Sequence, residues 1–167
     1  MPNWCENNLT ITGSKDDVAE VMKTVKSDDL EFDFNNVIPY PKEYAEPDAI
    51  YHKWLKENNN DFANAPKDGY NQGGYAWCNQ NWDTKWNACD VSINLYEEGV
   101  SRVYFNTAWS PPVNVIKKLA EQFPAVLFEL YYEEPGCCFK GEFSARGFNI
   151  IVDVTEDMTE EDIECDC

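Results

Sequence analysis

Apolar and polar residues alternate along several short stretches of the chain, the pattern that buries one face of a β-strand and leaves the other in water. In residues 8–12 the apolar positions are Leu9 and Ile11. Residues 91–96 and 102–107 alternate in the same way and are joined through a Glu-Glu-Gly segment, which favours a β-hairpin. The predicted strands are 8–12, 30–34, 91–96, 102–107, 127–132, 139–143 and, as a further candidate, 148–152.

Two other stretches carry their apolar residues at helical spacing. Residues 15–26 follow Ser14, which together with Asp17 resembles a capping box. Residues 113–123 follow a Ser-Pro-Pro sequence that begins at Ser110, and prolines at the first helical positions cost no hydrogen bond. Two such helices on an antiparallel sheet predict an α+β fold, a ferredoxin-like two-layer α/β sandwich with both helices on one face.

The predicted elements organise the chain into one domain and a tail. The domain covers residues 1–152, and an aromatic-rich insertion interrupts it at about 39–90. From 153 to 167, eight of fifteen residues are acidic and none is basic. This composition favours a solvated, mobile tail, and an acidic docking arm is the alternative.

Composition narrows the classes of partner. The chain has 167 residues, 43% of them hydrophobic and 14% aromatic, which is enough for one packed core. Its formal net charge of −18 repels phosphate groups, so direct binding to nucleic acid is disfavoured and basic proteins are the expected partners. The sequence holds no apolar run long enough for a membrane helix and no signal peptide, so we expect a soluble cytoplasmic protein without a membrane partner.

The reactive side chains do not form a complete catalytic or metal-binding set. Seven cysteines, an odd number, favour reduced thiols, and none has the C-x-x-C spacing of a zinc site, so we expect no metal and no cofactor. The single histidine, His52, has no partner in the sequence that would make it a catalytic base. Glu133 and Glu134 are the first candidates for an acid–base pair, but an enzyme is the least supported class.

The predicted insertion is a candidate recognition surface. Residues 39–90 hold ten aromatic residues among 52, with Gly and Asn between them. Large rings on loops that a rigid sheet supports suit recognition, because they offer wide contact area at small entropic cost. The alternative is a satellite core that fixes the insertion to the sheet.

A related candidate site lies where residues 107–110 end a strand and begin a helix. Free N–H groups at a helix start can hold a carboxylate or phosphate, and with Lys85 and tryptophan rings nearby the site would bind a small anionic ligand. The alternatives are that Ser110 caps the helix itself and that Asp83 and Lys85 form a local ion pair. The candidate binding residues are Trp77, Trp82, Asp83, Lys85, Trp86, Trp109 and Ser110.

Four segments carry a resemblance to a known family and together span most of the chain. They are PNWCENNL at 2–9, NWDTKW at 81–86, TAWSPP at 107–112, and 132–141 with Glu133, Gly136 and Gly141. In this order and spacing they resemble the YubB-like family of plasmid and phage proteins, which is described as having a ferredoxin-like domain and has no established reaction. Family members usually have Gly where this chain has Asp83. The resemblance implies a protein of the bacterial cytoplasm that is carried on a mobile element.

These observations give three functional hypotheses. The leading one is a non-enzymatic binding protein of a phage or plasmid that acts on a host protein with a basic surface and inhibits a bacterial defence system. The acidic charge and the aromatic insertion motivate the partner, and the resemblance implies the origin. The alternatives are a module that binds or sequesters a nucleotide signal, and a carboxylate-dependent hydrolase. An exposed sheet face or edge would also allow a homodimer.

Overall fold

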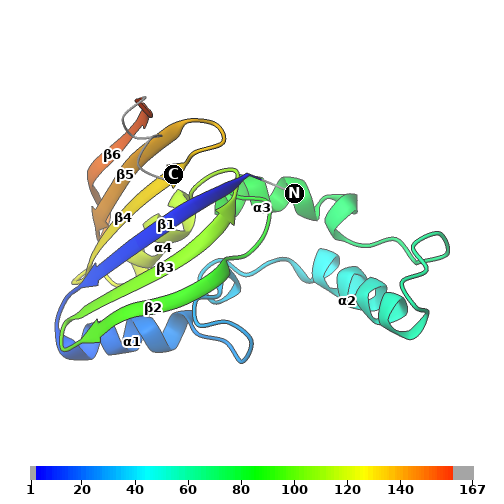
Figure 1. The fold of residues 1–167 in the computed structure, drawn as a ribbon. Helices are drawn as coiled ribbons and strands as arrows, with labels where there is room; N and C mark the ends of the chain where they lie inside the picture. Colours follow the sequence, from blue (N-terminus) through cyan, green and yellow to red (C-terminus); the bar gives the residue numbers. More distant parts are fainter. Residues whose placement is uncertain (1–2, 160–167) are drawn as a thin grey trace.

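The computed structural model describes residues 3–159 of the chain. Within this range one antiparallel sheet holds six strands in the spatial order β2-β3-β1-β4-β5-β6 (Figure 1). The strands are β1 (Trp4–Thr12), β2 (Cys89–Glu97), β3 (Val100–Ala108), β4 (Leu127–Glu134), β5 (Phe139–Arg146) and β6 (Asn149–Asp157). The first four have the arrangement of a ferredoxin-like domain, and β5 and β6 extend the sheet beyond β4.

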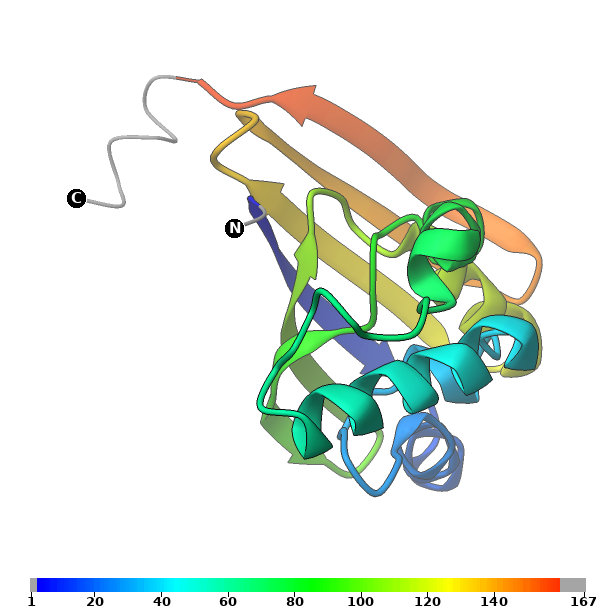
Figure 2. The same cartoon turned by 90° about the vertical axis from the view of Figure 1, so that its right-hand side faces the viewer.

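The helices form the second layer of the fold. Helices α1 (Lys15–Val25) and α4 (Val113–Gln122) lie on one face of the sheet, which confirms the predicted ferredoxin-like α+β sandwich (Figures 1 and 2). The segment between α1 and β2 forms η1 (Phe34–Asn36), α2 (Lys42–Glu57), η2 (Tyr70–Gln72) and α3 (Gly74–Trp82). None of these described helices covers the opposite side of the sheet, which we call the uncovered face.

Helix α1 forms for the reasons that its sequence pattern indicates. The Ser14 hydroxyl oxygen accepts the backbone N–H of Asp17 at 3.1 Å, which supplies a partner to one of the unpaired donors at the helix start. Val18, Val21 and Val25 are buried and face the sheet. The predicted hairpin also forms, as β2 and β3 pair on either side of a two-residue turn.

Residues 30–34 do not form the predicted strand. Phe32 and Phe34 are both fully buried, and their rings contact Phe105 of β3 at centroid distances of 5.0 and 6.1 Å. The backbone N–H of Phe34 donates to the Asn87 side chain at 2.9 Å rather than to another strand. The alternation in this segment therefore belongs to a loop whose rings pack into the core. The second strand of the chain is instead β2, which follows the insertion.

The end of the domain also differs from the prediction. Strand β6 continues to Asp157 and pairs with β5 along its length, so the predicted boundary between 152 and 153 falls inside a strand. Acidic residues such as Asp153 and Glu156 are tolerated there because the strand is exposed at the edge of the sheet. The rest of the predicted tail, residues 160–167, lies outside the described residues.

Candidate functional site

Trp82 joins the insertion to the core of the domain. Its side chain, at the end of α3, is only 3% exposed, and its indole N–H donates to the Ile38 carbonyl at 2.9 Å. The ring contacts Phe34, Tyr40 and Trp77 at centroid distances of 5.8, 5.9 and 5.4 Å. Trp77 is partly buried against the same core. Two of the candidate binding residues, Trp77 and Trp82, are therefore placed in the packing that fixes the insertion to the sheet.

Asp83 links the end of α3 to the start of α4. One carboxylate oxygen accepts the backbone N–H of Asn114 at 2.8 Å, and the other accepts the Asn114 side-chain amide at 2.9 Å. Burial raises the pKa of this carboxyl, and the backbone hydrogen bond from Asn114 partly offsets the shift. The residue has a φ of 62°, in the left-handed region. Glycine adopts this region without strain, which explains why glycine is usual at this position in the family that the sequence resembles.

Ser110 does not cap α4 as expected. The N-cap residue is Pro112, which offers no side-chain hydrogen bond, and the Ser110 hydroxyl donates to the Asp83 carbonyl instead. The Asp83 carboxylate is the group that bonds to the first turn of α4. The helix start that was a candidate anion site thus holds the chain's own carboxylate. Among residues 3–159, Asp83 and Lys85 make no ion pair with each other, and the Lys85 ammonium lies 4.8 Å from the centre of the Trp109 ring.

Substitutions at Asp83 separate its two roles. Asp83→Ala is expected to lower the free energy of unfolding by about 2 kcal/mol, because it removes the cap and leaves a side chain in the left-handed region. Asp83→Gly removes the cap but relieves the backbone strain, so its loss should be only about 1 kcal/mol. Urea denaturation of the two variants measures the difference. Equal losses would contradict the assignment of backbone strain to this position.

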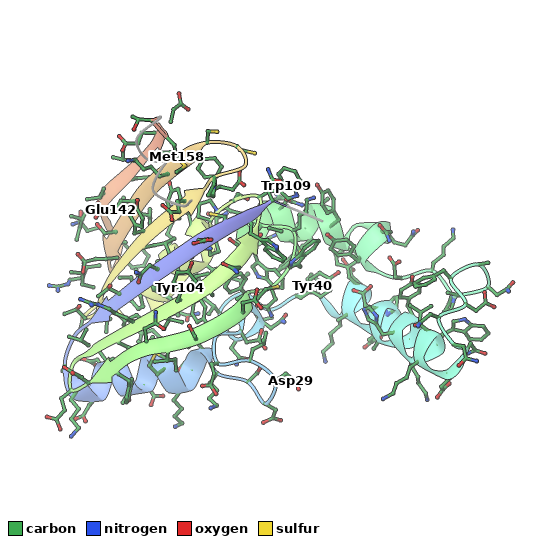
Figure 3. The ribbon with its side chains drawn as sticks, viewed as in Figure 1. Asp29, Tyr40, Tyr104, Trp109, Glu142 and Met158 are labelled. Atoms are coloured by element: carbon green, nitrogen blue, oxygen red, sulfur yellow. The ribbon has the colours of Figure 1, made fainter. Side chains whose placement is uncertain are left out.

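Two exposed tryptophans accompany Lys85 and Trp86 at the end of the sheet where the insertion joins it. Trp4 of β1 is 36% exposed and meets Trp86 edge to face at 6.4 Å. Trp109, which Figure 3 labels at the same end, is 37% exposed, and its backbone N–H donates to the Asn3 carbonyl at 3.0 Å. Trp86 is thus supported on one side by Trp4.

A groove lies between α2, the segment around η2, and Trp86. One part has a volume of ≈ 440 Å³, and an adjoining part of ≈ 520 Å³ shares Tyr70, Asn71 and Trp86 with it. The residues that define this insertion groove are Asp48, Tyr51, His52, Asp68, Tyr70 and Trp86. Tyr75 and Lys85 line the adjoining part.

Small residues allow the wall of the groove to approach α2. A Cβ atom at Gly69 would overlap the backbone of Tyr44, so only glycine permits this contact between the loop and the helix. Gly73 has a φ of 135°, which turns the chain from η2 into α3. Figure 3 shows Tyr40 between the sheet and α2, and its hydroxyl donates to Asp48 at 3.1 Å. The groove is therefore built by local backbone contacts and is attached to the core through Tyr40.

Aromatic rings and two carboxylates determine the chemistry of the insertion groove. Asp48 accepts the backbone N–H of Tyr70 at 2.8 Å, and Asp68 accepts the backbone N–H of Asn71 at 2.6 Å. Burial, with smaller contributions from Cys78, Tyr75 and Asp48, raises the pKa of Tyr70 to about 12. Within the described part of the chain neither aspartate forms an ion pair with Lys or Arg. The groove thus combines flat rings with negative charge, a combination suited to a cation.

The groups considered for catalysis are not brought together. Glu133 and Glu134 point to opposite faces of β4, as neighbours on a strand do. Glu134 is 1% exposed, and its two oxygens accept the N–H groups of Gly136 and Cys137 at 3.0 and 2.6 Å, so it holds the β4–β5 turn. The ring of His52 packs edge to face on Tyr51 at 5.5 Å, at the surface of α2. No cluster of three or more metal-ligating side chains occurs within residues 3–159.

The sequence prediction missed most of the groove. Asp48, Tyr51 and His52 lie at positions i, i+3 and i+4 of α2, so they share one helix face, and this spacing could have identified them. Asp68 lies just before η2 and Tyr70 begins it, and this short segment carries no sequence pattern that predicts a site. Of the seven predicted binding residues only Lys85 and Trp86 line the groove.

Comparisons with known proteins agree with the fold. The crystal structure of a protein api92 from Yersinia pseudotuberculosis superposes with a TM-score of 0.60, covers 95% of this chain and 99% of that chain, and is 8% identical in sequence. At this identity the likeness concerns the fold alone. No curated protein matches the chain. In the described part of the chain no helix is both long and apolar enough to cross a membrane.

A family model provides the sequence-level relationship. Residues 81–166 match the model described as the ferredoxin-like domain in Api92-like protein. The match includes the segments around Trp82, Trp109 and Gly141 that carried the resemblance noted from the sequence. The chain therefore belongs to the family of Api92-like proteins that contain this ferredoxin-like domain.

Proposed function

We propose that the chain is a non-enzymatic binding protein of a phage or plasmid, which engages a basic segment of a host protein through the insertion groove and so inhibits a bacterial defence system. The observation that carries the proposal is the lining of the groove, which Tyr51, Tyr70 and Trp86 share with the aspartates Asp48 and Asp68. The plasmid or phage origin rests on the sequence resemblance alone.

The lining suits an arginine or lysine side chain of the partner. A guanidinium group stacks on tyrosine and tryptophan faces, and a nearby carboxylate balances its charge. Trp86 is held by its edge contact with Trp4, so less conformational entropy is lost when a partner binds. The net charge of −18 attracts basic surfaces over longer distances and speeds association at low salt.

The nucleotide alternative has less support. Its stacking residue Trp82 is buried, and the helix start that would hold a phosphate is occupied by Asp83. Lys85 is the remaining cation that could bind the nucleotide phosphate, but its ammonium group already lies over the ring of Trp109. The hydrolase alternative is weakened in the same way, since Glu133 and Glu134 lie on opposite faces of the sheet.

A capture experiment tests the proposed partner. The immobilised protein is incubated with bacterial lysate at about 50 and about 500 mM salt, and bound proteins are identified by mass spectrometry. We expect a basic protein whose capture falls at the higher salt concentration. The double variant Tyr51→Ala/Trp86→Ala should reduce its capture at least about tenfold, because large aromatic residues dominate binding energy.

The control lies on the same helix. Ile50 is exposed and is not part of the groove lining, so Ile50→Ala should leave capture unchanged. Equal capture by the wild-type protein and the groove variant would refute the proposal. A rise in melting temperature with nucleotides or cyclic dinucleotides, without protein capture, would favour the nucleotide alternative.

A further inference from the structure

Strand β6 forms one edge of the sheet, at the opposite side from the insertion (Figure 1). It is nine residues long and pairs with β5 on one side only. An edge strand presents backbone N–H and C=O groups that can pair with another extended chain. Within residues 3–159, no segment covers the outer side of this strand.

The two edges of the sheet differ in regularity. Strand β2, at the other edge, shifts its register with β3 twice, between Cys89 and Ser92 and between Ile93 and Leu95. Such irregularities disrupt the ladder and protect an edge from further pairing. Strand β6 has one shift near its start, and from Val152 to Asp157 its pairing with β5 is regular. The second half of β6 is therefore the part of the sheet best suited to accept another strand.

The β6 edge also exposes apolar side chains. Phe148, in the turn before β6, is 86% exposed, and Val154 in the strand is 52% exposed. On the uncovered face, Val152 and Val154 border a hollow of ≈ 260 Å³, whose other lining residues are Tyr131, Lys140, Gly141, Glu142 and Glu156. A strand added beside β6 would place alternate side chains next to Val152 and Val154, close to this hollow.

Charge indicates what kind of strand would pair there. Asp153, Glu156 and Asp157 are exposed on β6, and the strand contains no Lys or Arg. The hollow is lined by two carboxylates, Glu142 and Glu156, and by one cation, Lys140, which pairs with Glu156 at 3.8 Å, so Glu142 supplies the remaining negative charge. A second copy would bring the same acidic residues together between two chains of charge −18, which opposes self-pairing.

We propose that the β6 edge binds an extended basic segment of a partner protein as an additional strand, with a lysine or arginine side chain over the hollow. The stem of such a side chain packs on Val154 and the ring of Tyr131, while its charged end reaches Glu142. This surface is separate from the insertion groove, so the proposal stands or fails independently of the proposed function.

Peptide binding followed by amide hydrogen exchange tests the strand geometry. The probe is a nine-residue peptide of alternating lysine and valine. We expect it to slow the exchange of amides between Val152 and Asp157, because an added strand occupies their outward N–H groups. A peptide methylated on alternate backbone nitrogens should give no protection, and neither should a peptide of alternating glutamate and valine. Absence of protection at about 2 mM lysine peptide would overturn the proposal.

Charge reversal tests the acidic groups with a matched control. Asp153→Lys/Glu156→Lys should weaken peptide binding at least about tenfold. Asp28→Lys/Asp29→Lys changes the net charge equally in an exposed loop, far from β6 in Figure 3, and should have a smaller effect. Unchanged melting temperatures establish that each variant is folded. Equal weakening by both variants would show non-specific attraction and overturn the proposal.

Two further outcomes locate the binding surface. The groove variant Tyr51→Ala/Trp86→Ala should retain the protection of β6 amides, and its loss would assign the peptide to the groove instead. Sedimentation of the protein alone should show a monomer across a concentration series. A concentration-dependent dimer that the Asp153→Lys/Glu156→Lys variant alters would assign the edge to a second copy and overturn the proposal.

Discussion

Replacing Trp82 by alanine is expected to lower the free energy of unfolding by about 3–5 kcal/mol, the usual cost of removing a buried aromatic side chain. The indole is almost fully buried and contacts the rings of Phe34 in η1, Tyr40 just before α2, and Trp77 in α3. Alanine would also leave the Ile38 carbonyl without its donor. Urea denaturation followed by circular dichroism measures the change.

The phenylalanine variant separates packing from hydrogen bonding at the same position. Trp82→Phe retains an aromatic ring but removes the indole N–H, so its cost should be about 1–3 kcal/mol. Because Trp82 packs the insertion against the core of the domain, the insertion and the sheet should unfold together, so both variants should show a single transition. A loss below about 1 kcal/mol for Trp82→Ala, or a separate early transition in the wild-type protein, would show that the insertion is not part of the common core.

The same burial explains why the sequence could suggest the aromatic insertion but not assign roles within it. Ten rings between 39 and 90 indicated either packing or recognition. The structure shows packing for some of them, and recognition by the others stays a proposal. Trp77 and Trp82 pack on the core, whereas Trp86 lines the groove. Their sequence context is similar, and the difference arises from contacts with Phe34 and α2 that are distant along the chain.

Elements with strong local signals were predicted well. The capping pair of Ser14 and Asp17 and the valine stripe located α1, and the Glu-Glu-Gly turn located the β2–β3 hairpin. Residues 30–34 had a strand-like period but no partner strand, and side-chain burial on one side of a loop gives the same alternation. At Ser110 the local cap signal was overridden by Asp83, which reaches α4 from α3. Such a contact between distant residues has no local pattern.

Raising the pH from about 9 to about 12 is expected to destabilise the fold by several kcal/mol, chiefly through buried thiols. Burial raises the pKa of the Cys5 thiol to about 12, and it raises that of Cys78 to about 11, against an ordinary value of 9.0. Above pH 9 the unfolded chain releases these protons while the native protein keeps them. The native state then binds more protons, so its stability falls as the pH rises, by about 1.4 kcal/mol per pH unit for one fully affected group.

Cys5→Ala tests this account at a position that is completely buried in β1. At pH 7 the variant is expected to be less stable than the wild-type protein, because the smaller side chain leaves a cavity. That loss is independent of pH, whereas the proton-linked loss disappears with the thiol. The two stability curves should therefore approach each other between about pH 9 and about pH 11, as measured by urea denaturation at each pH. Parallel curves would mean that Cys5 ionises equally in both states, which would contradict the raised pKa that burial gives this thiol.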